Sequence, residues 1–399
     1  MNAVIHARAW TRRLLGELLE IGSGQIDPRE EPFSSMLHVG SDNIESQTGR
    51  LFGMRPAGEL GLISGKFPFD SSTVLYSKIR PYLNKVALPD FAGICSADIY
   101  PLKPDPRILD RRFLAYLLRQ KDFLDYAEAF SARTSIPKIN REALAAYEAP
   151  LPPLEEQRRI VKVLDKADAI RRKRQEAIAL TEQLLRSTFL EMFGDPVTNP
   201  KHWPFESLTH LAMIGSGVMK GRDYTGIETV ERPYMRVANV QDGYLALDDI
   251  KTIELPVSEV EKYTLRHGDI LLTEGGDPDK LGRGAVWREQ VSSCVHQNHI
   301  FRVHPDRTRL TSEYLCALLG SAHGKRYFLK AAKQTTGIAT INRTQLSEFP
   351  VLLPPLKLQQ QYSEFVAAHE RLTQRYQHLA DEQNTLFNSL VQRAFSGQL

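Results

Sequence analysis

Two long stretches of the chain have the residue pattern of uninterrupted helices. From Glu155 to Phe193 there is no glycine or proline. The pair Pro152-Pro153 stands just before it, where a helix start tolerates a missing N–H. A second stretch follows Pro354-Pro355, and its seam positions from Phe365 to Leu390 step alternately by 4 and 3 residues. The pattern predicts two helices of roughly 38–40 residues, each about 55–60 Å long at 1.5 Å per residue.

The 3.5-residue period also predicts which face of each helix pairs with the other. The seam of the first helix aligns from Val163 to Thr188 with the seam of the second from Phe365 to Leu390. Two seams of similar length in one chain favour pairing with each other, and we expect the pair to be antiparallel. The positions expected at this contact are Val163, Ile170, Leu184, Leu372, Tyr376, Leu379, Leu386 and Leu390.

Short apolar runs separated by turn residues fill the rest of the chain. Residues 73–76, 269–272 and 300–303 read as buried strands, whereas 113–118 and 314–319 have helical spacing. This mixture predicts an α+β fold.

The sequence contains an internal repeat. Trp10 and the block Ile21–Gly24 recur 193 residues later, at Trp203 and Ile214–Gly217. The blocks Ile139-Asn140-Arg141 and Leu151-Pro152-Pro153-Leu154 recur 202 residues later, at 341–343 and 353–356. Ordered matches with a slowly drifting shift indicate a tandem repeat with loop insertions. We therefore expect two similar heads joined by two long antiparallel helices with an internal pseudo-two-fold repeat. The predicted segments are head 1 at 1–152, helix 1 at 153–195, head 2 at 196–353 and helix 2 at 354–399.

Composition narrows the class of protein. With 399 residues, 42% hydrophobic and 25% charged, the chain has ordinary globular composition. A net charge of +3 excludes a histone-like binder but leaves room for a locally basic groove. Three cysteines favour a reducing compartment, and no apolar run reaches the length of a membrane span. We expect a cytoplasmic protein that does not enter a membrane.

The repeat lacks the residues of catalysis. There is no G-x-x-x-x-G-K-[ST] phosphate loop and no Asn-Pro-Pro-aromatic motif of an amino-methyltransferase. Cys294, His296, His299 and His304 lie close in sequence, as zinc ligands do. The other copy has no such set, so we expect no metal in this chain. Because the motifs named above are missing, we also expect no catalytic residues.

The features that suggest DNA binding are local. The stretches 130–141 and 330–343 each hold three basic residues and no acid, and they are rich in side chains that can contact phosphates or bases. A glycine-rich segment, 274–283, has a head 1 counterpart at 77–85 with different side chains. The DNA-binding candidates are Lys78, Arg80, Arg133, Thr134, Ser135, Lys138, Asn140, Arg141, Lys220, Arg222, Tyr224, Lys280, Arg283, Gln297, Asn298, Lys333, Gln334, Thr335, Thr336, Asn342 and Arg343.

Each candidate has a plainer interpretation. Asn140 and Asn342 can be helix caps, and the loops can be ordinary surface turns. The shared Arg141 and Arg343 cannot by themselves distinguish two half-sites. If they bind DNA, we expect them to contact phosphates, while the unlike neighbours read bases.

The whole pattern resembles the specificity (S) subunit of type I restriction–modification enzymes. The resemblance rests on the doubled architecture, on the block from Leu151 to Val161 that opens a long helix, on Gly268–Thr273 and on the Ile-Asn-Arg blocks. The second copy departs from the helix-opening block, since it reads LKLQQQ from Leu356.

The resemblance implies a division of labour. Each head, a target recognition domain, would read half of a gapped double-stranded DNA site, and the helices would set the gap and bind two modification (M) subunits. S-adenosylmethionine would belong to the M subunits, while ATP and Mg would belong to restriction (R) subunits; this chain would hold no cofactor. Two other interpretations are a protein-binding scaffold without DNA, and the specificity half of a combined restriction–methylation enzyme.

Overall fold

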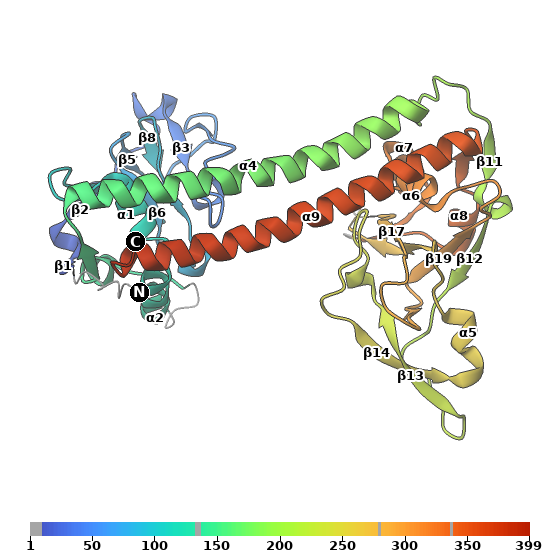
Figure 1. Cartoon of the computed structure of the whole chain (residues 1–399). Coiled ribbons are helices and arrows are strands. Elements are labelled where there is room, and N and C mark those ends of the chain that lie inside the picture. Colours follow the sequence, from blue (N-terminus) through green and yellow to red (C-terminus); the bar gives the residue numbers. More distant parts are fainter. Residues whose placement is uncertain (1–9, 132–136, 278–280, 336–337) are drawn as a thin grey trace. The chain divides into compact units, whose positions relative to one another are not determined.

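The chain packs into two compact units that share both long helices. The computed structural model describes residues 10–131, 137–277, 281–335 and 338–399 (Figure 1). Unit 1 consists of residues 1–176 with 378–399, and unit 2 of residues 177–377. Each unit therefore contains one head and part of each long helix. No helix among the described residues is long and apolar enough to cross a membrane.

Head 1 is built on a four-stranded antiparallel sheet. The strand order is β2 (Leu19–Ile21), β9 (Ile99–Pro104), β6 (Val74–Ser77) and β7 (Val86–Ala87). A second sheet has the order β4 (Arg55–Pro56), β3 (Leu37–Val39), β8 (Gly93–Cys95) and β5 (Phe67–Phe69). The remaining strand pair and helices are β1 (Thr11–Leu14) with β10 (Glu148–Leu151), α1 (Arg111–Leu117), α2 (Lys121–Ser131) and α3 (Arg141–Ala145).

Head 2 repeats this topology. Its four-stranded sheet has the order β12 (Ala212–Ser216), β19 (Ile300–Pro305), β15 (Ile270–Thr273) and β17 (Gly284–Val286). The second sheet has the order β14 (Lys251–Pro256), β13 (Thr229–Met235) and β18 (Val295–His296). The remaining elements are β11 (Phe205–Ser207) with β22 (Pro350–Leu352), α5 (Val260–Tyr263), α6 (Ser312–Gly320), α7 (Ala322–Ala331) and α8 (Arg343–Ser347). The tandem repeat and the α+β class are confirmed.

The apolar runs form central strands because both faces of these strands are covered. In β6, Val74 and Tyr76 lie in the core beneath the helices, while Leu75 faces the core of the second sheet. In β15, Ile270 and Leu272 face the helix side and Leu271 the other. A strand buried on both faces needs no polar alternation, which is why these segments read as continuous apolar runs.

A buried glutamine fixes the start of each long helix. Helix α4 spans Leu154–Phe193 and α9 spans Leu356–Phe395, each just after the predicted proline pair. The Gln157 amide is fully buried: its Oε1 accepts from the Asp110 N–H at 2.8 Å, and its Nε2 donates to the carbonyls of Ile108 and Pro152. Because Asp110 caps α1, this side chain joins the starts of two helices.

Gln359 makes the same three contacts in unit 2. Its Oε1 accepts from the Thr311 N–H at 3.0 Å, and its Nε2 donates to the carbonyls of Arg309 and Pro354. The repeated Pro-Pro-x-x-x-Gln block is therefore a structural joint between head and helix.

The two long helices run antiparallel within each unit. In unit 1, Arg159 donates to the Leu399 carbonyl, and the Arg171 guanidinium lies 4.7 Å from the centre of the Phe387 ring. In unit 2, His369 Nε2 lies 2.8 Å from the Thr181 carbonyl oxygen, and the Phe193 and Tyr362 rings are 5.4 Å apart. In both units, rising numbers in α4 meet falling numbers in α9, as predicted.

The prediction that eight residues line the contact between the helices was wrong for four of them. Their side chains are exposed: Ile170 by 53%, Leu184 by 50%, Leu372 by 40% and Leu386 by 59%. Val163, Tyr376, Leu379 and Leu390 are half-buried. At the four failed positions the next residue along the helix, such as Arg171 or Phe387, faces inward instead.

Polar residues inside the contact explain the error. Asp168 is almost fully buried and pairs with Arg171 at 2.6 Å and with Arg172 at 2.9 Å. Thr181 is buried as well, and its hydroxyl donates to the Ile178 carbonyl. A charge can be buried when it is paired, so the inner face of α4 is less apolar than its outer face at these positions.

Candidate nucleic-acid interface

In head 2 the candidate loops leave one end of the four-stranded sheet. β12 ends at Ser216 opposite Phe301, β15 ends at Thr273 opposite Ile300, and β17 begins at Gly284. The candidates near 220, 274–283 and 297–298 therefore all adjoin this end of the sheet, because neighbouring strands alternate in direction.

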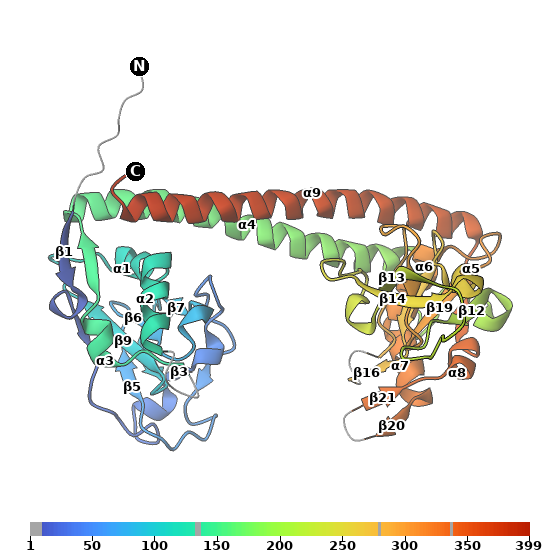
Figure 2. The same cartoon turned by 90° about the horizontal axis from the view of Figure 1, so that it is seen from below.

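Backbone hydrogen bonds tie these loops to each other. The Asn298 N–H donates to the Val218 carbonyl, the Glu274 N–H to the His299 carbonyl, and the Ile341 N–H to the Glu274 carbonyl. A small sheet extends the same edge: β16 (Gly275–Gly276) pairs with β21 (Ile338–Thr340), which pairs with β20 (Lys333–Thr335) (Figure 2). Segments that lie far apart in sequence, between Val218 and Ile341, thus form one surface.

Head 1 gathers its candidates in the same way. The Lys78 N–H donates to the Asp98 carbonyl at 3.0 Å, and the Ile139 N–H donates to the Lys78 carbonyl at 3.0 Å. Ile79 and Lys138 form an antiparallel bridge. The segment around Lys78 and Arg80 therefore lies beside the basic stretch that ends at Arg141. We call this end of the sheet, with its loops, the strand-end surface of each head.

The shared Ile-Asn-Arg block has a structural role in both heads. Ile139 and Ile341 are buried in the cores. Asn140 caps α3 by accepting from the Ala143 N–H at 2.8 Å, and Asn342 caps α8 by accepting from the Gln345 N–H at 2.9 Å. The helix-cap interpretation is confirmed for both asparagines.

The arginines of the two blocks differ. The Arg141 guanidinium donates to the carbonyls of Ile21 and Gly22 and lies over the Tyr100 ring at 5.2 Å from its centre. These contacts join α3 to β2, so Arg141 has a structural role that the sequence did not reveal. Arg343 is exposed at the start of α8. Contact with phosphate stays a prediction for the exposed Arg343, whereas the bonds of Arg141 within head 1 favour a structural role for that residue.

Several other candidates have partners at the strand-end surface. Lys78 Nζ lies 5.3 Å from the centre of the Tyr100 ring. Arg283 Nη1 donates to the Gln241 side chain at 2.9 Å, and Asn298 Nδ2 lies 3.3 Å from His299 Nε2. Half-buried cations held in this way are oriented rather than freely mobile.

The loop around Arg222 is partly engaged within head 2. Arg222 pairs with Glu259 at 3.2 Å, and its guanidinium lies 5.5 Å from the centre of the Tyr224 ring. Lys220 is exposed two residues after Val218, beside Asn298. Lys220 is therefore better placed than Arg222 to meet a ligand at the strand-end surface.

The remaining candidates divide by what the structure describes. Exposed or half-buried candidates at the strand-end surface also include Arg80, Lys138, Gln297 and Lys333. Arg133, Thr134, Ser135, Lys280 and Thr336 lie outside the described residues, as do the side chains of Gln334 and Thr335.

Sequence reasoning missed two polar residues at this surface. His299 Nδ1 lies 2.9 Å from Glu274 Oε2, so the imidazole proton on Nδ1 is held by the carboxylate. Both residues belong to segments already singled out, but neither basic composition nor the repeat could mark an acid as part of a DNA-binding surface.

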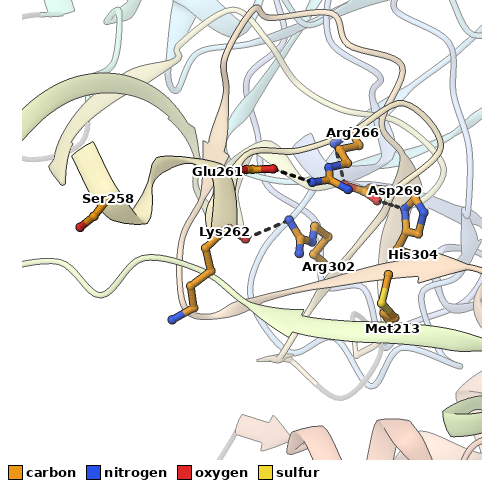
Figure 3. Close-up of a pocket in the computed structure, with 8 residues that line it drawn as sticks. All are labelled: Met213, Ser258, Glu261, Lys262, Arg266, Asp269, Arg302 and His304. Atoms are coloured by element: carbon orange, nitrogen blue, oxygen red, sulfur yellow. Dashed lines mark hydrogen bonds and ion pairs between the residues drawn. The ribbon is translucent and has the colours of Figure 1, made fainter. Parts of the chain in front are cut away.

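A pocket of about 440 Å³ lies at the opposite end of the same strands in head 2 (Figure 3). The buried Asp269, just before β15, accepts from His304 Nδ1 at 2.7 Å and from the Arg266 N–H. Arg302 donates to the carbonyls of Lys262 and Thr264 at the end of α5. Figure 3 shows Ser258 well away from His304, so the pocket does not present a nucleophile–base–acid chain.

The histidines near Cys294 serve separate environments. His296 is fully buried with Nδ1 3.2 Å from the Tyr263 carbonyl, whereas His299 meets Glu274 and His304 meets Asp269. Burial raises the pKa of the Cys294 thiol to about 12. In the described part of the chain, no group of three or more His, Cys, Asp or Glu residues is placed to hold a metal ion.

Residues 54–180 and 201–381 match the family model described as the type I restriction modification DNA specificity domain. Each half of the chain supplies one match, in agreement with the tandem repeat.

Individual relatives have the same description. The chain is 34% identical over 193 residues to the Type I restriction enzyme EcoDI specificity subunit of Escherichia coli, covering 47% of this chain and 42% of that one. It is 21% identical over 325 residues to the StySPI specificity subunit of Salmonella potsdam, covering 77% and 69%. The alignment thus spans less than half the length of the first relative.

A solved structure is similar over nearly the whole length. That structure comes from a study of the structural basis of complex assembly and conformational transition of the type I R-M system. The similarity covers 98% of this chain and 99% of that one, with a TM-score of 0.58 and 21% identity. At this identity, the similarity shows the fold.

Proposed function

Because the chain belongs to the family of type I restriction–modification DNA specificity proteins, we propose that it selects the DNA sequence on which a multisubunit enzyme acts. Each head reads one half of a bipartite, gapped double-stranded site. The observation that carries the proposal is the strand-end surface, which has the same backbone frame in both heads and unlike side chains on that frame.

The chemistry of that surface suits duplex DNA. Lys78, Arg80 and Lys138 in head 1, with Lys220, Arg283 and Lys333 in head 2, supply positive charge for phosphates. Gln297 and Asn298 supply amide groups that can pair with base edges. A shared frame gives both heads a common way of docking, and unlike side chains allow two different half-sites.

Catalysis in this proposal belongs to partner subunits. Two modification subunits bind the long helices and use S-adenosylmethionine, and restriction subunits use ATP and Mg.

The test is a comparison of the chain with and without its modification subunits. The complex should methylate adenine within one gapped sequence motif, whereas the chain alone should transfer no methyl group. Duplex binding by the complex should weaken steeply as salt rises. A chain that assembles with partners but gives no salt-dependent duplex binding would be a protein scaffold, and the proposal would be wrong.

A further inference from the structure

The backbone frames of the two strand-end surfaces correspond residue by residue. The Lys78 N–H donates to the Asp98 carbonyl, and the Glu274 N–H donates to the His299 carbonyl, both at 3.0 Å. The carbonyls of Lys78 and Glu274 accept from the first residue of each Ile-Asn-Arg block, at 3.0 and 2.9 Å. Residue 78 therefore corresponds to 274, and residue 98 to 299.

Two further pairs of bonds extend the correspondence. The Ser77 backbone N–H donates to the Lys85 carbonyl at 3.1 Å, and the Thr273 backbone N–H donates to the Arg283 carbonyl at 2.9 Å. Ser96 and Gln297 each accept from the first residue of β9 or β19, Ile99 or Ile300. Positions 85 and 283 keep a cation in both heads, whereas positions 78 and 274 do not.

The side chains at the corresponding central positions have opposite character. Head 1 has a cation, Lys78, at the position where head 2 has the carboxylate of Glu274. Head 1 has the exposed acid Asp98 where head 2 has His299, and Ala97 where head 2 has Asn298. At the position of Lys78 and Glu274, head 2 thus presents an acceptor where head 1 presents a donor.

The acceptors of head 2 are held in place. Because a carboxylate only accepts, His299 Nδ1 donates to Glu274 Oε2 at 2.9 Å, and His299 Nε2 lies 3.3 Å from Asn298 Nδ2. The Glu274 side chain is only 33% exposed, and this contact orients its second carboxylate oxygen, Oε1. A carboxylate beside a polyanion is unfavourable unless it accepts a specific hydrogen bond.

We infer that positions 78 and 274, supported by 98, 298 and 299, determine which base each head selects. This inference rests on the proposed function. Lys78 donates to the O6 and N7 acceptors of a guanine in one half-site. Glu274 accepts from an exocyclic amino group in the other half-site, that of cytosine N4 or adenine N6, with His299 as its positioning residue.

The test uses the full chain assembled with its modification subunits and a pool of duplexes randomised across both half-sites. Wild-type complex should select guanine at one position of the first half-site and a base with an amino group at one position of the second. Cytosine or adenine at that position identifies the source of the amino group.

Exchange of one functional group should then change one base. Glu274→Leu, which removes the acceptor without supplying an amide that could pair with adenine, should change the preference at that position of the second half-site by about tenfold. Its preference in the first half-site and its salt dependence should stay as in wild type. Lys78→Gln should give the converse result. Glu261→Leu is the matched control, since it removes a carboxylate that is 92% exposed at the opposite end of the same strands.

The outcomes are distinguishable. If wild-type complex selects no sequence at all, the proposed function fails. If wild type selects a motif and Glu274→Leu selects the same motif, the present inference fails. A lower thermal unfolding temperature with unchanged base preference would show that Glu274 only braces His299, and would overturn the inference too.

Discussion

At the scale of single residues, buried amides and guanidinium groups connect parts of the chain that are far apart in sequence. Gln157 contacts three backbone groups from two segments, and Arg141 reaches across about 120 residues to the carbonyls at the end of β2. Such side chains leave orphaned backbone groups behind when they are removed, and that cost exceeds the value of the bond itself.

We predict that Gln157→Leu destabilises unit 1 by about 3 kcal/mol or more, since three backbone groups lose their partner at about 1–3 kcal/mol each. Gln175→Leu, at an exposed position of α4, should change the free energy of unfolding by less than about 0.5 kcal/mol. Urea unfolding of the three proteins measures both. Equal effects at the two positions would contradict the role of Gln157 as a joint.

We predict different effects for the two repeated arginines. Arg141→Ala should lower thermal stability and leave the salt dependence of DNA binding unchanged, because its guanidinium bonds to Ile21 and Gly22. Arg343→Ala should keep the unfolding temperature and lower the salt slope by about one. Measuring both quantities on each variant separates a brace from a phosphate contact, and identical behaviour would refute the distinction.

Burial lowers the pKa of His296 from 6.5 to about 4. The imidazole of His296 is therefore protonated more readily in the unfolded chain than in the folded chain. As a result, the stability of unit 2 decreases as pH falls from about 6.5 to 4. From pH 7 to 5, we expect this residue to cost about 2 kcal/mol. Urea unfolding at several pH values across this range measures the free energy of unfolding. This free energy should depend less on pH in His296→Gln than in wild type, whereas the exposed His210→Gln should have the pH dependence of wild type.

At the scale of secondary-structure elements, the inner face of the helix pair is one residue away from the predicted seam at four positions. Phe387 packs on the core of unit 1, with its ring 6.4 Å from Tyr116, whereas its neighbour Leu386 is exposed. The exposed leucines Leu184, Leu372 and Leu386 can contact another protein. This agrees with the proposal that partner subunits bind these helices.

We predict that Phe387→Asp lowers the free energy of unfolding of the chain by about 2–4 kcal/mol. Leu386→Asp should change it by less than about 0.5 kcal/mol. The contrast is best measured on the chain without partner subunits. If Leu386→Asp proves the more damaging, the heptad seam of the sequence is correct and the observed contact is not.

The helices, the repeat and the central strands could be predicted, because each has a local signature in period, punctuation or recurrence. The seam could not, since hydrophobicity does not mark Asp168 with Arg171 or Thr181 as inward-facing. The strand-end surface was predicted only in part: a basic stretch marked Lys138 and the counterpart of the glycine-rich segment marked Lys78, while nothing in the sequence marked Glu274 and His299 as DNA-binding residues. The tether of Arg141 depends on a fold that brings β2 beside α3.

At the scale of the whole molecule, the repeated heads invite exchange. We predict that replacing residues 203–352 with the corresponding head of another family member changes one half-site of the recognised motif and preserves the other. Each head has its own core and its own strand-end surface, so no base-reading residue is shared. Mapping of methylated adenines in cells that carry the exchanged chain gives the answer, and a change in both half-sites would refute independent reading.

The division of unit 1 between distant parts of the chain has a consequence for biosynthesis. Its core includes Val391, Ala394 and Phe395, which the ribosome adds after every residue of unit 2. At about 5–20 residues per second, the roughly 200 intervening residues take about 10–40 s. The half that is translated first is thus completed last, and during that interval its apolar surface beneath α9 lacks the residues that cover it in the finished chain.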